Sequence, residues 1–131
     1  MKAVDTNVLV RVLTRDDPEQ ASVAAAEMRA GPIHVSVTVL LETEWVLRHA
    51  YAFDRDQVGR ALAGVVDLAG ATIDDESAVR AALRWHARGM DLADALHVAR
   101  LHPGTEFITF DKRLARRATE LAVNPRVRLL E

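Results

Sequence analysis

Four carboxylates could do chemistry because each adjoins apolar residues, where a charged group is costly. They are Asp5, Glu42, Asp94 and Asp111. An ionised carboxylate in apolar surroundings is tolerated when it is paired with a cation, hydrogen-bonded or bound to a metal. Three of the four have no lysine or arginine beside them in the sequence. Because Mg²⁺ prefers hard oxygen ligands, the pattern predicts a divalent-cation site and, with it, phosphate chemistry.

Each carboxylate also has a purely structural explanation. Asp5 and Asp111 each precede a predicted helix and therefore fit an N-cap. Glu42 fits an ordinary solvated glutamate of a helix. Asp94 is harder to explain in this way, because aspartate is a poor residue in a helix interior and Asp91 is the better N-cap of the same helix. The four residues taken together therefore favour a functional site.

The histidines and tryptophans carry weaker signals. His97 follows Asp94 by three residues on one predicted helix, so the two side chains can meet. We interpret His97 as a hydrogen-bond partner of the carboxylate, with a metal ligand as the alternative. Trp45 and Trp85 are expected to be core or interface residues rather than platforms on which bases stack.

Short strands alternate with helices along the whole chain. The pattern predicts strands at 2–5, 33–37, 71–73, 105–110 and 127–130. It predicts helices over 6–13, 18–30, from Thr38 through the Trp45 region, over 54–70, from Asp74 or Asp75 to Gly89, over 91–101 and over 112–121. The expected caps of the first four are Thr6 or Asn7, an acid of Asp16-Asp17 before Pro18, Thr38 and Asp54. Glycines at 31, 70 and 89 are the expected stops. This alternation predicts one α/β domain over residues 1–131, with a mostly parallel sheet covered on both faces.

The predicted elements place the four acids at one edge of that sheet. Ligands of open parallel sheets bind outside the carboxyl ends of the strands. Asp5 and Asp111 each follow a strand, and Glu42 and Asp94 lie one turn inside helices that begin near the same edge. If three or four acids gather there, either a cation neutralises them or some have raised pKa values.

Composition excludes several other kinds of site. The chain has no cysteine, which excludes a disulfide scaffold, a thiolate zinc site and a cysteine nucleophile. The acidic residue at position 5 interrupts any signal peptide, and no apolar stretch approaches the roughly 18 residues needed to cross a bilayer. We therefore expect a soluble, cytoplasmic protein.

Positive charge is concentrated near the C-terminus, although the formal net charge of the chain is only −2. The segment 112–128 contains six basic residues and one acid, Glu120. Such a patch attracts nucleic acid, and Arg113, Arg116 and Arg117 are the expected contacts to an RNA backbone. An arginine content that merely reflects genome composition is the alternative.

Four motifs in order resemble PIN-domain ribonucleases, most closely the VapC-like toxins of type II toxin–antitoxin pairs. The motifs are V-D-T-N-V-L-V at 4–10, L-L-E-T-E-W-V-L-R at 40–48, D-L-A-D-A-L-H at 91–97 and T-F-D-K-R-L at 109–114. The resemblance implies a three-layer α/β/α PIN-like domain and an endoribonuclease that depends on Mg²⁺, or alternatively on Mn²⁺. It also implies a homodimer and a cognate antitoxin protein as partners.

The resemblance assigns roles residue by residue. The catalytic acids of the family fall on Asp5, Glu42, Asp94 and Asp111, with Asp5 and Asp94 the surest metal ligands. Thr109 and Asn7 match positions that often support the site by hydrogen bonds. One position departs from the pattern, because many relatives have a second acid where this chain has Arg113. Occupancy by a second metal is therefore an open alternative.

Three other functions fit parts of the pattern. A non-catalytic interaction module on the same fold would keep the acids only as vestiges, and intact acids at all four positions argue against it. A phospho-acceptor receiver domain requires paired early acids, whereas Asp5 is followed by Thr6 and Asn7. A phosphatase of the D-x-D type is excluded because position 7 is asparagine.

Overall fold

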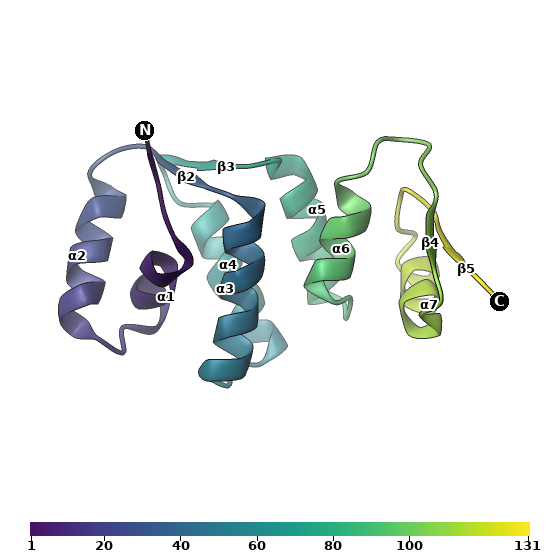
Figure 1. Cartoon of the computed structure of the whole chain (residues 1–131), viewed down its shortest axis with the longest axis horizontal. Coiled ribbons are helices and arrows are strands. Elements are labelled where there is room, and N and C mark those ends of the chain that lie inside the picture. The colour runs from purple at the N-terminus through teal and green to yellow at the C-terminus, as the bar shows by residue number, and fades with distance from the viewer. The chain divides into compact units, whose positions relative to one another are not determined.

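The structure is a computed structural model that describes all residues from 1 to 131. The chain forms two compact units, Met1–Glu76 and Ser77–Glu131. Each unit contains its own helices and its own parallel strands (Figure 1). Each is described below by itself.

Unit 1 contains a three-stranded parallel sheet in the order β1-β2-β3. Lys2 of the first strand lies opposite Ile33 of the second, and Ile33 lies opposite Ala71 of the third. Its elements are β1 (Lys2–Ala3), α1 (Thr6–Thr14), α2 (Pro18–Arg29), β2 (Ile33–Val35), α3 (Val37–Ala50), α4 (Arg55–Val66) and β3 (Ala71–Ile73).

Side-chain caps explain where the helices of unit 1 begin. Asp17 caps α2 immediately before Pro18, as predicted, and Asp54 forms a capping box with Gln57 at the start of α4. Two predicted caps are wrong by one or two residues. Asp5, not Thr6 or Asn7, caps α1, and Ser36, not Thr38, caps α3. In both cases the residue directly before the helix still has extended backbone and turns its side chain onto the new helix.

The core of unit 1 is aliphatic. Fully buried side chains come from the sheet, from α1, from α3 and from α4: Leu9, Ile33, Val35, Leu47, Val58 and Leu62. Because strands and helices contribute to the same core, the carboxyl ends of β1 and β2 and the first turns of α1 and α3 are held in fixed positions.

Unit 2 contains a pair of parallel strands, β4 and β5, in register at Phe107 with Val127. Helix α5 (Glu76–Ala87) starts at the last residue of unit 1. The remaining elements are α6 (Leu92–Ala99), β4 (Phe107–Thr109), α7 (Lys112–Glu120) and β5 (Val127–Leu129). Met90, Leu92, Ala95 and Val98 are buried around α6.

All observed strand pairs are parallel, and strands alternate with helices as the sequence predicts. The strand Ala71–Ile73 has the predicted bounds. The other four are shorter than predicted; for example, 33–37 becomes Ile33–Val35 and 105–110 becomes Phe107–Thr109. No helix has the length and apolar character that a membrane span requires.

Truncation of Leu47 should show how strongly the core holds α3. The side chain of Leu47 is fully buried, so Leu47→Ala should lower the free energy of unfolding by about 2–5 kcal/mol. Leu68→Ala is the matched control, because Leu68 is 40% exposed in the same unit and should cost less than about 1 kcal/mol. Urea unfolding followed by circular dichroism measures both. Equal losses in the two variants would contradict this description of the core.

Candidate acidic site

Asp5 lies between β1 and α1 and uses one oxygen to begin the helix. Its backbone is extended, with φ −83° and ψ 162°, and its Oδ1 accepts a hydrogen bond of 2.8 Å from the backbone N–H of Thr6. No protein group in unit 1 donates to Oδ2, so this oxygen is available to a ligand. The cap and a ligand role are therefore compatible in one side chain.

Thr6 brings Glu42 to the same place. Its side chain is only 5% exposed, and its hydroxyl Oγ1 donates a hydrogen bond to Oε1 of Glu42 on α3. Because Thr6 directly follows Asp5, this bond joins the turn after β1 to the second turn of α3. Thr6 is not among the site residues expected from the sequence. Its position directly after Asp5 was the only available signal.

Glu44 has a different role from Glu42. The side chain of Glu44 is buried and accepts two hydrogen bonds from the guanidinium of Arg48, one turn further along α3. Glu42 points elsewhere and remains exposed. Only Glu42 of this pair is therefore available to a ligand.

Asp94 is half-buried in the first turn of α6. Burial raises the pKa of the Asp94 carboxyl above its usual value of 3.8, and the negative charges of Asp91 and Asp111 raise it further, whereas the charge of His97 lowers it. Asp91 is the predicted cap of α6, and its Oδ1 accepts a 3.1 Å hydrogen bond from the N–H of Asp94. Unit 2 thus holds Asp94 where its charge is disfavoured.

Asp111 follows β4 and caps α7. Its Oδ1 accepts a 3.0 Å hydrogen bond from the N–H of Leu114, while its own N–H donates to Oγ1 of Thr109 at 3.0 Å. Thr109 thus supports the backbone of Asp111, in keeping with the supporting role expected for it. Asn7 forms no side-chain hydrogen bond with the acids of unit 1.

Three of the four acids are not in the apolar surroundings that the sequence suggests. Asp5, Glu42 and Asp111 are exposed, and only Asp94 is partly withdrawn from water, so the apolar neighbours in the sequence do not surround the first three side chains. Several apolar residues beside Asp5 and Asp111 are themselves exposed, among them Phe110 at 75% and Ile108 at 52%. The acids stand at the ends of strands or on the outer face of a helix. Within its own unit, none of the four forms an ion pair with lysine or arginine.

The acids fall into two pairs. Unit 1 holds Asp5 and Glu42, and unit 2 holds Asp94 and Asp111, so neither unit alone contains three His, Asp or Glu side chains grouped for a metal. The donors are carboxylate oxygens, the hard ligands that suit Mg²⁺ and Mn²⁺. A cation would also relieve the repulsion that disfavours the charge of Asp94. The residues therefore fit a divalent metal.

His97 has an aromatic neighbour. Its ring stacks on the ring of Phe107, with centroids 6.2 Å apart and an interplanar angle of 17°. Its effect on Asp94 is through charge, and no hydrogen bond joins the two side chains. The hydrogen bond predicted between them is therefore absent.

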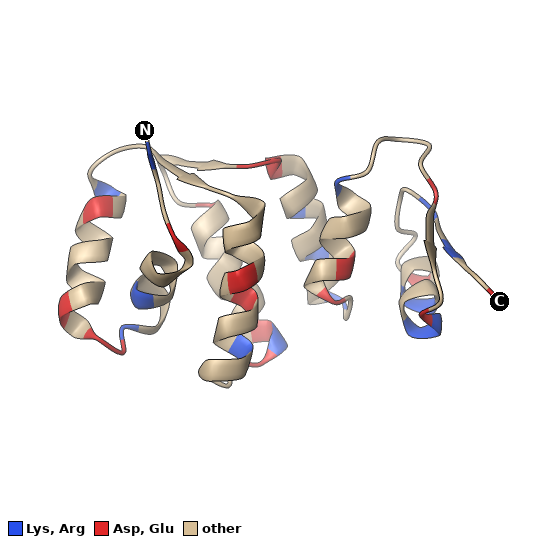
Figure 2. Cartoon of the chain, viewed as in Figure 1, with Lys and Arg blue, Asp and Glu red and all other residues tan.

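The basic residues of α7 differ in how firmly they are held. Figure 2 shows lysine and arginine along this helix. Arg117 pairs with Glu120 at 3.1 Å, and its guanidinium lies 3.2 Å from the point where a Cβ on Gly89 would be. Arg113 and Arg116 are exposed and have no ion pair. Arg113 and Arg116 are thus better placed than Arg117 to contact a phosphate.

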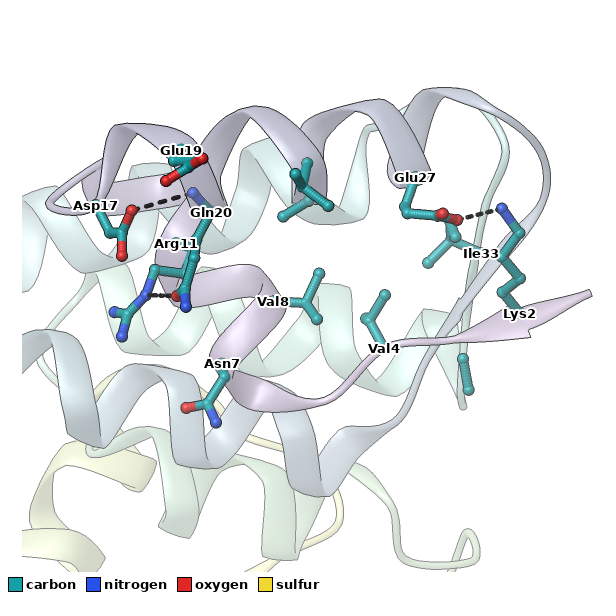
Figure 3. A pocket seen from close by; sticks show the side chains of 13 residues that line it. Lys2, Val4, Asn7, Val8, Arg11, Asp17, Glu19, Gln20, Glu27 and Ile33 are labelled. Carbon is teal, nitrogen blue, oxygen red and sulfur yellow. Dashed lines mark hydrogen bonds and ion pairs between the residues drawn. The ribbon is translucent and has the colours of Figure 1, made fainter.

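A groove of about 620 Å³ lies between α1 and α2 in unit 1 (Figure 3). Val4, Val8 and Ile33 contribute apolar surface, and an ion pair between Lys2 and Glu27 lies at its edge. Neither Asp5 nor Glu42 lines it. The groove is therefore a separate feature from the acids.

Comparison with known families gives one match. The model of the family described as the PIN domain matches residues 2–120, a range that includes all four acids. No curated protein matches the chain. Together with the helices and parallel strands, the family match confirms the predicted three-layer α/β/α fold class.

The raised pKa of Asp94 predicts a pH dependence of stability. Because the folded state binds this proton more tightly than the unfolded state, whose carboxyl has the usual value of 3.8, stability falls as pH rises above about 4. Asp94→Asn cannot ionise and should escape this loss. Urea unfolding in chelator-treated buffer between about pH 4 and pH 7 measures this. The free energy of unfolding of the variant should increase relative to that of the wild type as pH rises.

Asp56→Asn is the control, since Asp56 is an exposed carboxylate paired with Arg60 in unit 1. Parallel curves for wild type and Asp94→Asn would show that the charge of Asp94 is not disfavoured in the folded protein.

Proposed function

The chain belongs to the PIN-domain family, whose members are generally nucleases, and on this premise we propose that it is a metal-dependent endoribonuclease. The family match over residues 2–120 is the observation that carries the proposal. The presence of all four acids, each without a basic partner in its own unit, supports it. The proposed substrate is RNA, and the reaction is hydrolysis of a phosphodiester bond.

In this proposal Asp5 and Asp94 bind Mg²⁺ or Mn²⁺, and Asp111 is a ligand or a close neighbour of the ion. When bound, the ion supplies positive charge beside the reacting phosphate. The N-caps fix one oxygen of Asp5 and one of Asp111, leaving the second oxygen of each for this role.

Glu42 is the proposed base. Its Oε1 accepts the hydrogen bond from Thr6, which holds the carboxylate and leaves Oε2 to orient the attacking water and take its proton. The water attacks phosphorus in line and displaces the 3′ oxygen of the neighbouring ribose, which takes a proton from solvent. The products are a 5′-phosphate and a 3′-hydroxyl end.

The resemblance to VapC-like toxins supports a biological setting. We infer a cytoplasmic toxin that forms a homodimer and is neutralised by a cognate antitoxin protein. A short reading frame for a DNA-binding protein directly upstream of the gene would support this setting.

Removal of the metal or of Asp94 should abolish cleavage. Wild-type protein with Mg²⁺ should cut a structured RNA, EDTA should stop the reaction, and Asp94→Asn should lower the rate by about a hundredfold or more, the scale of losing one preorganised electrostatic contact. Asp56→Asn, which removes an exposed carboxylate of α4, should cut at the wild-type rate. Labelled RNA resolved on gels measures all four reactions.

Cleavage that survives both EDTA and Asp94→Asn would eliminate the metal mechanism. Absence of cleavage by a protein that still binds Mg²⁺ and RNA would instead favour the non-catalytic interaction module.

The exposed arginines of α7 should govern the salt dependence of RNA binding. The double variant Arg113→Gln and Arg116→Gln should weaken binding to RNAs of any sequence. The slope of log K against log salt concentration should become less steep by about one to two. Fluorescence anisotropy over a range of salt concentrations measures the slope. Arg29→Gln, on α2 in unit 1, is the control and should leave the slope unchanged. An unchanged slope in the double variant would remove α7 from the RNA interface.

A further inference from the structure

The turn of residues 88–91 joins α5 to α6 in unit 2. The backbone N–H of Met90 donates to the carbonyl of Trp85 at 3.1 Å. The backbone N–H of Gly89 donates to the carbonyl of His86 at 3.0 Å. These two bonds form a Schellman motif, which ends many helices and places a residue with positive φ just after the helix. Gly89 occupies that position with φ 106°, so the end of α5 depends on a glycine here.

The same turn fixes the start of α6. Asp91 is the last residue of the turn and caps α6, because its Oδ1 accepts the 3.1 Å hydrogen bond from the N–H of Asp94. The carbonyl of Asp91 accepts a second bond, of 2.9 Å, from the N–H of Ala95. Only Met90, which is 2% exposed, separates Gly89 from the cap. A displacement of the turn therefore displaces Asp94 as well.

The guanidinium of Arg117 on α7 lies against Gly89. Its Nε and Cζ are each 3.2 Å, and its Nη2 is 3.4 Å, from the point where a Cβ on Gly89 would be. An edge-on approach would leave the carbon farther away than the two nitrogens, so the planar group faces the glycine with its flat side. Glycine at this position thus provides both the positive φ and the space that the guanidinium occupies.

Charge makes this contact favourable. The last carbonyl groups of a helix carry partial negative charge, so a cation beside the end of α5 stabilises that end. Arg117 also pairs with Glu120 through Nη1 at 3.1 Å, but the two side chains are 42% and 49% exposed, and such a pair contributes little. The ion pair alone therefore does not explain why the guanidinium lies on the turn.

Helix α7 also carries the second acid of unit 2. Asp111 caps α7, which packs against β4 and β5 and has Leu114 and Ala118 buried. Arg117 extends from this helix to the turn before α6. The contact therefore joins the two elements that hold Asp111 and Asp94, and the negative charge of Asp111 raises the pKa of the Asp94 carboxyl.

We propose that Arg117 is a positioning residue, whose guanidinium stabilises the turn between α5 and α6 and so fixes Asp94 relative to Asp111. The proposal rests on the proposed nuclease function, in which these acids lie at the metal, and it adds a residue that acts through another. Contact with an RNA phosphate, the role expected for Arg117 from the sequence, is the competing explanation. Both roles need positive charge, but only the positioning role needs the contact with Gly89.

Amide hydrogen exchange tests the contact without any need for cleavage. Arg117→Gln should make the amides of Gly89 and Asp94 exchange about two- to fivefold faster, the scale of losing one cation at a helix end. Arg117→Lys, which keeps the charge, should lie nearer to the wild type. Two controls on α7 should leave these amides unchanged: Arg116→Gln removes an exposed arginine, and Glu120→Gln removes the ion pair but keeps the guanidinium. Wild-type exchange in Arg117→Gln would overturn the proposal.

RNA binding and kinetics separate positioning from a phosphate contact. In a Glu42→Gln background, which prevents cleavage, Arg117→Gln should leave the slope of log K against log salt concentration unchanged, whereas loss of a phosphate contact would make it less steep by about one. With Glu42 restored, Arg117→Gln should lower kcat several-fold and change KM little, because a displaced metal ligand impairs the reaction rather than RNA binding. Glu120→Gln should cleave at the wild-type rate. A less steep slope with unchanged kcat would show that Arg117 contacts RNA instead, and would overturn the proposal.

Failure of this proposal is distinguishable from failure of the proposed function. If wild-type protein cleaves RNA but Arg117→Gln keeps wild-type exchange and kcat, the positioning proposal alone is wrong. If wild-type protein cleaves nothing while Arg117→Gln still accelerates exchange at Gly89 and Asp94, the contact of Arg117 with the turn stands and the nuclease proposal fails.

Discussion

The partial burial of one carboxylate beside two others is the constraint on which the proposed site depends. Asp94 is partly withdrawn from water and faces the charges of Asp91 and Asp111, and all three effects raise the pKa of its carboxyl. No arginine or lysine in unit 2 forms an ion pair with it. A folded protein that keeps such a group gains from any divalent cation that binds there, because the ion removes the repulsion and replaces the lost hydration. In the proposed function, the cost of keeping Asp94 charged would therefore favour binding of the metal.

The helix caps hold two of the acids through one carboxylate oxygen and leave the other oxygen available to a ligand. Asp5 and Asp111 each follow a strand and accept one hydrogen bond from the first turn of the next helix. A carboxylate has two oxygens, so the cap orients the group while the second oxygen stays free. The buried hydroxyl of Thr6 orients Glu42 in the same way. The structural and functional explanations of these acids, which compete at the level of sequence, are thus complementary in the structure.

Alternation of strands and helices was predictable because the apolar periodicity, the Asp-Pro helix start and the glycine stops are local signals. The α/β class, the order of elements and the caps Asp17, Asp54 and Asp91 follow from them. The exposure of the acids was not predictable from the sequence, since it depends on which side of a strand end faces the core. Asp5 and Asp111 have apolar neighbours in the sequence yet lie at the surface. The contact from Thr6 to Glu42 joins residues 36 apart and has no local signal. Trp45 is 56% exposed, so the core role expected for it is wrong, whereas the interface role stays a prediction.

Calorimetric titration with Mg²⁺ and with Mn²⁺ is the most direct test that the two pairs of acids serve one ion. The wild-type protein should bind at a shared site, and Asp5→Asn and Asp94→Asn, which alter different units, should each weaken binding by about tenfold or more. Asp56→Asn should bind as the wild type does. Wild-type affinity in either aspartate variant would show that its unit does not contribute to the site, and would contradict the account.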